Sequence, residues 1–429
     1  MTAPSESAPA ESIDDDRYLE AMASSGGKRA MFVAQPIYSA NGIKLLDTGA
    51  RVDSRVLGRL FGQKLAEPID RCVASEDAIR PKDLSARGRE LVAAIPLLSY
   101  LDAGLGAGSA RLWSAWENGS LPPAIAIRLT VVRDTATDLY DHALRCAFLA
   151  AFIGLGGRFS DRDLQSVVTA ALLHDLGMMH VDPAHYAQNK PLDASARRGL
   201  LAHPLTGQLI AQREPQLSPA VASAIAEHHE RIDGSGYPRG LLGDSIGKLG
   251  RALALAEVAI GVVDRLPEQA CGLLAPLLRF NRRSFDGALC DVLLGALPRT
   301  VPGEAPMAEG SAAFDAGVAL IDAWKRGPEA RNVGERDAAA EFIDARIDRL
   351  CRWLADAGVD DPQAAARAAQ EEPALHWEIA ALAREVRWHL RQIAYDVSER
   401  WPPSPGGDGL ARSDRVAGWI AAVQESTTT

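Results

Sequence analysis

Histidines and acidic residues gather in the middle of this 429-residue chain. Seven of the nine histidines lie between His142 and His229, and five of these stand at polar or helix-terminal positions: His142, His174, His203, His228 and His229. Neutral imidazole and carboxylate are common ligands of divalent transition metals. The five cysteines are scattered without a Cys-x-x-Cys pair, which disfavours a disulfide framework and a thiolate zinc site. The pattern therefore predicts a metal site of imidazole and carboxylate groups.

The adjacent pair His174 and Asp175 favours more than one ion. Neighbouring residues on a helix point about 100° apart, so the two side chains are poorly placed to chelate one cation. They suit two neighbouring cations, with Asp175 as the bridge between them. Taken alone, a histidine is more often a hydrogen-bonded core or surface residue. We give that interpretation to the remaining four: His180, His185, His376 and His389.

A second polar element, EHHERIDGSGYPRG, runs from Glu227 to Gly240. Its glycines, including Gly234 and Gly236, allow a tight turn, because glycine tolerates positive φ and the close approach of a ligand. Tyr237 is expected to fix the rim of this loop. The alternative is a polar surface turn that carries no chemistry.

Helices are expected to position these groups, because the apolar spacing between Asp134 and Asp264 is strongly helical. LQSVVTAALLHDLG places apolar residues on one face and ends near Gly177, as a buried helix with a glycine stop would. HPLTGQLIAQ and SPAVASAIAEHH are predicted to be two more helices. In the C-terminal third, two apolar stripes around Ile347 and Leu390 indicate further helices whose faces are core rather than ligand sites.

The composition changes several times along the chain and suggests where its parts begin and end. A Ser- and acid-rich start, a hairpin signal at Asn41-Gly42 and the stretch PPSPGGDG mark three of the changes. The predicted parts are a disordered tail at 1–27, a small β-containing module at 28–80, a helical connector at 81–130, the histidine-bearing domain at 131–300, a C-terminal helical region at 311–401, and a linker with a short terminal helix at 402–429.

The overall composition excludes several classes of protein. Hydrophobic residues make up 47% and charged residues 24% of the chain, as in ordinary globular domains. The net charge of -10 disfavours DNA or RNA as a partner, since nucleic-acid binders display a basic face. No apolar run approaches the roughly 18 residues of a membrane-spanning helix, and the acidic N-terminus lacks the apolar segment of a secretory signal. We expect a cytoplasmic protein without a membrane span.

The order H…HD…H…HH followed by DGxGYP resembles the HD-GYP domains of bacterial signalling, a branch of the HD metal-dependent phosphohydrolase superfamily. The matching segments are DHALRCA, LLHDLGMMHVDP, NKPLD, HPLTGQLI, HHERIDGSGYPRGLLGDSI and RALALAE, which together span about a third of the chain. The resemblance implies a mainly α fold. We expect an HD-superfamily helical bundle with a small β-containing N-terminal module and extra C-terminal helices.

Carried over by position, the resemblance implies a set of metal ligands: His142, His174, Asp175, His203, His228, His229, Glu257 and Asp138. Asp138 stands where members with three ions carry an acidic residue, usually glutamate. Glu257 stands in Ala-Glu where the family has Ala-Asp. Two or three divalent ions, most commonly iron or manganese, are implied, and His174 and Asp175 are the residues implied to be catalytic.

The activity implied by the resemblance is hydrolysis of cyclic di-GMP to pGpG or to GMP. Two cations would activate a water molecule and neutralise charge on the phosphoryl oxygens. The expected substrate contacts are Tyr237, Gly236, Lys190, Arg251 and Arg265. Diguanylate cyclase (GGDEF) proteins are the expected partners of the GYP loop, and a homodimer is left open.

Two departures from the family favour a different class of function. The family lysine of HDxGK is Met178 here, and no RPYR-like stretch follows Ala256-Glu257. Each lost charge-assisted phosphate contact would weaken binding by ~1.5–3 kcal/mol. The alternative is therefore a weak or inactive protein that binds cyclic dinucleotides or partner proteins, with the intact ligand set favouring the enzyme.

Overall fold

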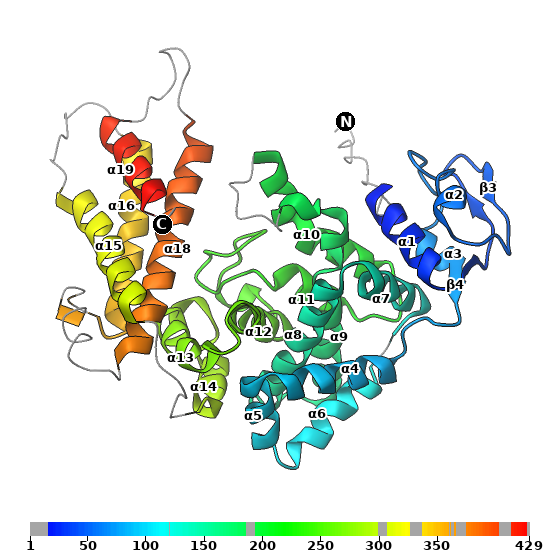
Figure 1. Cartoon of the computed structure of the whole chain (residues 1–429), viewed down its shortest axis with the longest axis horizontal. Coiled ribbons are helices and arrows are strands. Elements are labelled where there is room, and N and C mark those ends of the chain that lie inside the picture. Colours follow the sequence, from blue (N-terminus) through cyan, green and yellow to red (C-terminus); the bar gives the residue numbers. More distant parts are fainter. Residues whose placement is uncertain are drawn as a thin grey trace, which may run out of the picture. The chain divides into compact units, whose positions relative to one another are not determined.

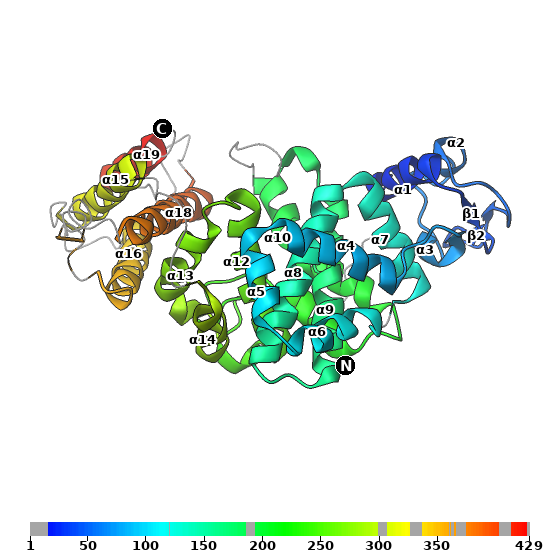
Figure 2. The same ribbon diagram turned by 60° about the horizontal axis from the view of Figure 1, so that its bottom comes forward.

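The computed structural model of the chain describes residues 16–119, 121–185, 194–298, 307–326, 337–359, 361, 364–365, 375–402 and 413–426. Helices dominate these residues, and the short strands among them all lie near the N-terminus (Figures 1 and 2). The mainly helical fold with a small β-containing module is thereby confirmed. By its contacts the chain forms two compact units, Met1–Asp264 with Ser284–Val292, and Arg265–Arg283 with Leu293–Thr429.

The N-terminal module combines short helices with two antiparallel strand pairs. Its elements are α1 (Asp16–Lys28), β1 (Met31–Val33), β2 (Ile37–Tyr38), β3 (Lys44–Leu46), α2 (Ser54–Leu57), α3 (Ile69–Cys72) and β4 (Val73–Ser75). β1 pairs with β4 and β2 pairs with β3. Gly42, between β2 and β3, has φ +80°, so the predicted hairpin signal at Asn41-Gly42 is confirmed.

The prediction of a disordered tail at residues 1–27 is wrong from residue 16 onward. Residues 1–15 lie outside the described part of the chain, but α1 begins at Asp16 and buries Tyr18, Leu19 and Met22. These apolar side chains recur along one face of the helix and join the core of the module. Their burial outweighs the weak helix propensity of the Ser- and Gly-rich end of the segment.

A buried ion pair ties this module to the helices that follow it. Nε of Arg128 lies 2.6 Å from Oδ2 of Asp70, and the two side chains are 4% and 2% exposed. The hydroxyl of Tyr18 donates to Asp70, while the guanidinium of Arg128 lies 4.1 Å from the centroid of the Tyr18 ring. These contacts supply the compensation that buried charges need.

The connector expected at 81–130 is helical and forms part of the core. It contains α4 (Pro81–Ala94), α5 (Pro96–Gly104), α6 (Gly108–Glu117) and α7 (Pro123–Thr135). α4 can approach α6 closely at Gly88, where an added Cβ would lie 2.8 Å from the ring of Trp116. α7 is buried along most of its length, so these helices are more than a spacer.

The residues around the histidines form a bundle within the first unit. Its elements are α8 (Thr137–Gly156), α9 (Asp161–Leu173), η1 (Leu176–His180), η2 (Pro183–His185), α10 (Ala194–Gln212), α11 (Pro219–Glu227), η3 (Gly243–Ser245) and α12 (Lys248–Arg265). α9 starts at a capping box formed by Ser160 and Asp163 and packs against α8, α6 and α11. Its predicted apolar face, from Leu164 to Leu172, is buried as expected.

By length and composition alone, α8 is a helix that could cross a membrane. Two thirds of the apolar window (67%) is buried inside the protein, against α9, α4 and α7. Such burial is typical of the central helix of a globular bundle. We interpret α8 as the core helix of the first unit.

The second unit is an assembly of helices. Its elements are α13 (Ala270–Phe280), α15 (Met307–Arg326), α16 (Ala338–Asp356), α18 (His376–Arg400) and α19 (Asp414–Glu425), while α14 (Gly287–Ala296) runs across the division between the units. The two predicted stripes are confirmed, because Ile343, Ile347 and Leu350 of α16 and Val386 and Leu390 of α18 are all buried in one core. The predicted domain at 131–300 does not match this division, since 265–283 belongs to the second unit.

Candidate metal centre

Helix ends and helix faces bring the predicted ligands together from five segments. His142 lies on α8, His174 caps the C-terminus of α9, and Asp175 is the N-cap residue of η1. His203 lies on α10, His228 caps α11 and is followed by His229, and Glu257 lies on α12. Seven of the eight predicted ligands fall into two neighbouring groups that could each hold an ion.

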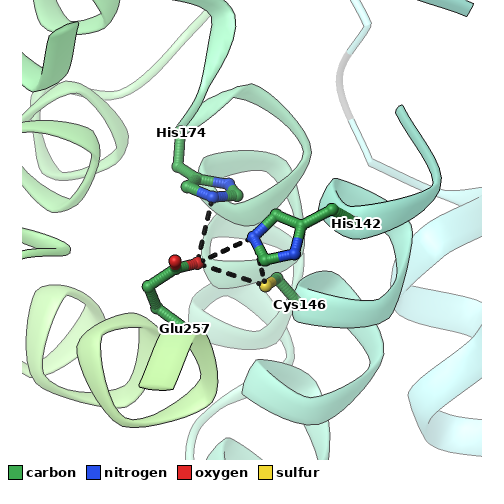
Figure 3. A group of neighbouring side chains, drawn as sticks. All are labelled: His142, Cys146, His174 and Glu257. Atoms are coloured by element: carbon green, nitrogen blue, oxygen red, sulfur yellow. Dashed lines mark hydrogen bonds and ion pairs between the residues drawn. The ribbon is translucent and has the colours of Figure 1, made fainter. Parts of the chain in front are cut away.

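The first group consists of His142, Cys146, His174 and Glu257, whose side chains converge in Figure 3. Oε2 of Glu257 lies 3.0 Å from Nε2 of His142 and 3.3 Å from Nε2 of His174. Sγ of Cys146 lies 3.4 Å from both Glu257 Oε2 and His142 Nε2. The extra methylene of glutamate, compared with the family's aspartate, does not keep Glu257 from this group.

The second group consists of Asp175, His203, His228 and His229. Nε2 of His203 lies 3.2 Å from Nε2 of His228 and 3.2 Å from Oδ1 of Asp175. The other oxygen of Asp175, Oδ2, lies 3.3 Å from Nε2 of His174 in the first group. Asp175 thus faces both groups, as its predicted bridging role requires.

Backbone carbonyls hold three of the imidazoles in the same orientation. Nδ1 of His174 lies 2.7 Å from the carbonyl of Ala171, and Nδ1 of His228 lies 2.6 Å from that of Ile225. These carbonyls lack the next helical N–H because α9 and α11 end there. Each Nδ1 therefore donates its proton, which leaves the lone pair on Nε2 directed into the centre.

His203 achieves the same orientation in the middle of a helix, with the help of the proline that follows it. Nδ1 of His203 lies 2.6 Å from the carbonyl of Leu200. In an uninterrupted helix the N–H of residue 204 would bond to that carbonyl, but Pro204 has no N–H to donate. The sequence His203-Pro204 therefore frees a carbonyl for its own imidazole.

His142 is oriented by a carboxylate. Its Nδ1 lies 2.6 Å from Oδ2 of Asp264, and the other oxygen of Asp264 lies 2.6 Å from Nε of Arg145. A carboxylate on the far nitrogen of an imidazole fixes its tautomer and raises its basicity as a ligand. Sequence analysis missed Asp264, although it lies seven residues after Glu257 on the same face of α12.

Burial and close approach shift the pKa values of these groups in opposite directions. Despite burial, which opposes charge, His174 and His203 hold the pKa of Asp175 well below its usual range. Burial opposes protonation of His174 as well, but Asp175 and Glu257 raise its pKa to about 10. Burial, together with His174 and His203, lowers the pKa of His228 to about 3. In the protein alone, the centre therefore combines anionic carboxylates with a protonated His174 and a neutral His228, and a bound cation would displace the proton of His174.

The arrangement fits divalent cations. Nε2 of His174 is fully buried and makes no hydrogen bond of acceptable geometry, although two carboxylate oxygens lie 3.3 Å away. Nε2 of His203 and Nε2 of His228 face each other at 3.2 Å, with both Nδ1 atoms already committed to carbonyls. Lone pairs that converge without donors are satisfied by a metal ion.

The glycine-rich loop after His229 closes against the second group. The ring of Tyr237 stacks on that of His229, with centroids 4.5 Å apart. The backbone N–H of Tyr237 donates to the carbonyl of His229. An added Cβ at Gly236 would lie 2.4 to 2.5 Å from the backbone of residues 229–231, so only glycine fits there. The buried carboxylate of Glu230 accepts from the N–H groups of Arg239 and Leu241. The loop is thus built onto the histidines rather than being a mere surface turn.

The remaining predicted substrate contacts and the predicted ligand of a third ion do not join the two groups in the described residues. Arg251 bonds to the carbonyls of Gly243 and Ile246 and pairs with Asp244 and Asp286, so it holds the loop. Arg265 belongs to the second unit, and Lys190 lies outside the described residues. Asp138 is exposed in the first turn of α8 and joins neither group of ligands.

Cys146 is the second residue that sequence analysis missed. The predicted centre consists of imidazole and carboxylate groups, and the structure also places the thiol of Cys146 among the side chains of the first group. Burial raises its pKa to about 12 in the protein alone. The signal was the spacing in HALRC, which puts Cys146 one turn after His142 on the same helix face.

Comparison with known proteins gives one matching family, whose description is HD domain, over residues 129–262. The chain is 34% identical over 162 residues to 3'3'-cGAMP-specific phosphodiesterase 3 of Vibrio cholerae, covering 37% of this chain and 35% of that protein. It is 28% identical over 155 residues to the cyclic di-GMP phosphodiesterase response regulator RpfG of Xanthomonas campestris pv. campestris, covering 35% and 41%.

A cyclic di-GMP phosphodiesterase of Pseudomonas aeruginosa is 34% identical over 143 residues, covering 32% of this chain and 34% of that protein. The chain thus spans roughly a third to two fifths of these relatives. Among solved structures, the HDG"Y"P protein Bd1817 from Bdellovibrio bacteriovorus aligns at 17% identity and a TM-score of 0.34, over 62% of this chain and 95% of that one.

Proposed function

We propose that the protein is a metal-dependent phosphodiesterase of the HD-GYP type acting on cyclic dinucleotides, because residues 129–262 match the HD domain family and resemble cyclic-dinucleotide phosphodiesterases. The proposed substrate is cyclic di-GMP, hydrolysed to pGpG or to GMP, with 3'3'-cGAMP as the related substrate to compare. The observation that carries this proposal is the position of Asp175, whose two oxygens face the two ligand groups.

The chemistry needs two cations side by side, and the chain's residues would hold them. When bound, such ions activate water and offset the charge that builds on phosphoryl oxygens. His142, His174 and Glu257 would hold one ion and the second group the other, with Asp175 shared. Since Asp138 lies apart from both groups, two ions are favoured over three, and iron and manganese are the proposed metals.

The loop that follows the histidines would shape the substrate pocket. The face of the Tyr237 ring that is turned away from His229 would suit a nucleobase, and Gly236 lets the backbone come close to the second ligand group. The positive charge of the metal ions would also attract an anionic substrate to a chain whose net charge is negative. Binding of GGDEF proteins, self-association and a cytoplasmic location complete the proposal.

The test is hydrolysis by the purified full-length protein. It is loaded with Mn²⁺ or Fe²⁺ and incubated separately with cyclic di-GMP and 3'3'-cGAMP, and products are separated by chromatography. We expect turnover that Asp175→Ala abolishes and that Asp161→Ala, an exposed acid at the start of α9, leaves unchanged. No turnover of either dinucleotide by metal-loaded protein would contradict the proposed activity.

A second candidate is a binding protein that keeps the fold and the ions but hydrolyses slowly. It is favoured by the position of Met178, which is buried where the family has a lysine, and by the bonds that commit Arg251 to the loop. Calorimetric binding of cyclic di-GMP without product formation would support this candidate over the enzyme.

A further inference from the structure

Cys146 occupies a place in the centre that the proposed ligand set leaves unexplained. It is fully buried on α8, one turn from His142, and its sulfur points toward Glu257 in Figure 3. Residues four apart on a helix lie on the same face, so α8 presents an imidazole and a thiol together. Nothing about packing requires sulfur at this position, since a valine would fill similar space.

Three of the distances within the first group are close to the edges of a coordination tetrahedron. Ligand atoms at about 2.1 Å (nitrogen or oxygen) and about 2.3 Å (sulfur) from one ion are about 3.4 to 3.6 Å apart. The sulfur of Cys146 lies 3.4 Å from Nε2 of His142 and 3.4 Å from Oε2 of Glu257. Oε2 of Glu257 lies 3.3 Å from Nε2 of His174, the buried atom without a hydrogen bond. Nε2 of His142 and Oε2 of Glu257 lie closer, at 3.0 Å, and all four ligand atoms lie within 4.8 Å of one another.

The two groups differ in the kind of atom they offer. The first offers two nitrogens, one oxygen and one sulfur, while the second offers three nitrogens and an oxygen of Asp175. Thiolate is a soft ligand that favours cations such as Fe²⁺, Co²⁺ and Zn²⁺ over Mn²⁺ or Mg²⁺. The second group lacks this preference.

We propose that Cys146 is the fourth ligand of the first group, which consequently selects a thiophilic cation and gives the two halves of the centre different metal preferences. On binding, the thiol proton leaves to solvent, and a sulfur electron pair forms the bond to the cation. This inference rests on the two-ion centre of the proposed function. The competing role is a thiol that only donates a hydrogen bond to Glu257.

The test is titration of the metal-free full-length protein with Co²⁺ alone, followed by near-ultraviolet absorption. A sulfur ligand gives an intense charge-transfer band, which we expect in the wild type and in Cys290→Ser, a matched control at another fully buried cysteine. His229→Ala, which removes a ligand of the second group only, should keep the band. Cys146→Ser should lose it.

Competition between Co²⁺ and Mn²⁺ measures the selectivity directly. Loss of a group that only supports a metal ligand lowers metal affinity roughly 10- to 100-fold. Cys146→Ser removes a ligand itself, so it should reduce the preference for Co²⁺ by at least this factor. X-ray absorption of the Co²⁺-loaded wild type needs no variant and should show one sulfur at about 2.3 Å.

The outcomes separate this inference from the function on which it rests. Two bound ions with only nitrogen and oxygen ligands, or a band that survives in Cys146→Ser, overturn the role of Cys146 and leave the two-ion centre standing. A wild type that takes up neither Co²⁺ nor Mn²⁺ overturns both.

Discussion

Buried histidines occur in both units of the molecule, and their surroundings give them opposite properties. In the first unit, His174 sits at the end of α9, beside two carboxylates, and its pKa is raised to about 10. In the second unit, His389 lies inside α18 among the rings of Trp353, Phe280 and Trp388. Burial, with Arg346 and Arg349 nearby, lowers the pKa of His389 to about 3.

Nearby carboxylates account for the raised pKa of His174, and the two histidines differ as well in their position within the helix. A histidine at a helix end, or before a proline, can donate to a carbonyl that the helix has left open, as His174 and His203 do. Within α18 the carbonyls near His389 already accept helical N–H groups, and its Nε2 has no hydrogen-bond partner. The histidines proposed as ligands are thus distinguished by an oriented ring as well as by neighbouring carboxylates.

The largest effect is expected from replacing one histidine of each unit by phenylalanine. His174→Phe removes a ligand that faces both carboxylates, so metal uptake by the first group and hydrolysis should fall by more than ~10²-fold. His389→Phe places an aromatic ring among aromatic rings and should leave both unchanged. Metal analysis and the chromatographic assay measure the two effects, and equal losses in both variants would refute the comparison.

Removal of metal should destabilise the first unit alone. An ion present at 100 times its dissociation constant stabilises the folded state by about 2.7 kcal/mol. Hydrogen exchange with and without chelator should therefore show faster exchange in α8 and α12, with α16 and α18 unchanged. Protection lost equally from both units would contradict separate roles.

Loss of the carboxylate behind His142 should have an intermediate effect. Asp264→Asn keeps the shape but weakens the acceptor for Nδ1 of His142, so affinity for the ion of the first group should fall roughly 10- to 100-fold. Isothermal titration of metal-free protein measures this change. Asp161→Asn, at an exposed ion pair with Arg111, is the control and should bind normally.

The smallest expected effect is a loss of stability of the second unit at low pH. Because the folded-state pKa of His389 is depressed, the unfolded chain binds its proton first as pH falls below about 6.5. Stability from this residue is complete above that pH and is lost toward pH 3, with about 1 kcal/mol gone at pH 6. Hydrogen exchange of α18 at pH 7.5 and pH 6, corrected for intrinsic rates, should show this loss in the wild type and not in His389→Phe.

The sequence predicted well those features that depend on local pattern. The apolar faces of α9, α16 and α18 follow from helical periodicity, and the order of polar residues points to the seven predicted ligand residues that the structure brings together. Cys146 and Asp264 were missed because their helix spacing to His142 and Glu257 is a weak signal, and the contacts that place them in the site come from partners more than a hundred residues away, Glu257 and His142 respectively.

The predictions that differ from the structure have a similar cause. α1 was taken for a tail because its polar and small residues obscure a short apolar face, which finds its core only when the strands fold beside it. Arg251 was expected at the substrate because basic residues suit phosphate, but Asp244 and Asp286 pair with it first. Long-range partners decided each case.

The ion pair of Asp70 with Arg128 sets a practical limit on how the chain can be shortened. Cutting before α4, to isolate the histidine-bearing helices, would leave the guanidinium of Arg128 without its carboxylate and uncover Ile127 and Val131, which pack into the N-terminal core. Stranding one member of a buried pair costs ~3–5 kcal/mol, a large share of the stability of a typical domain. Residues 16–80 therefore stabilise the histidine-bearing helices, and expression of the domain should begin at or before Asp16.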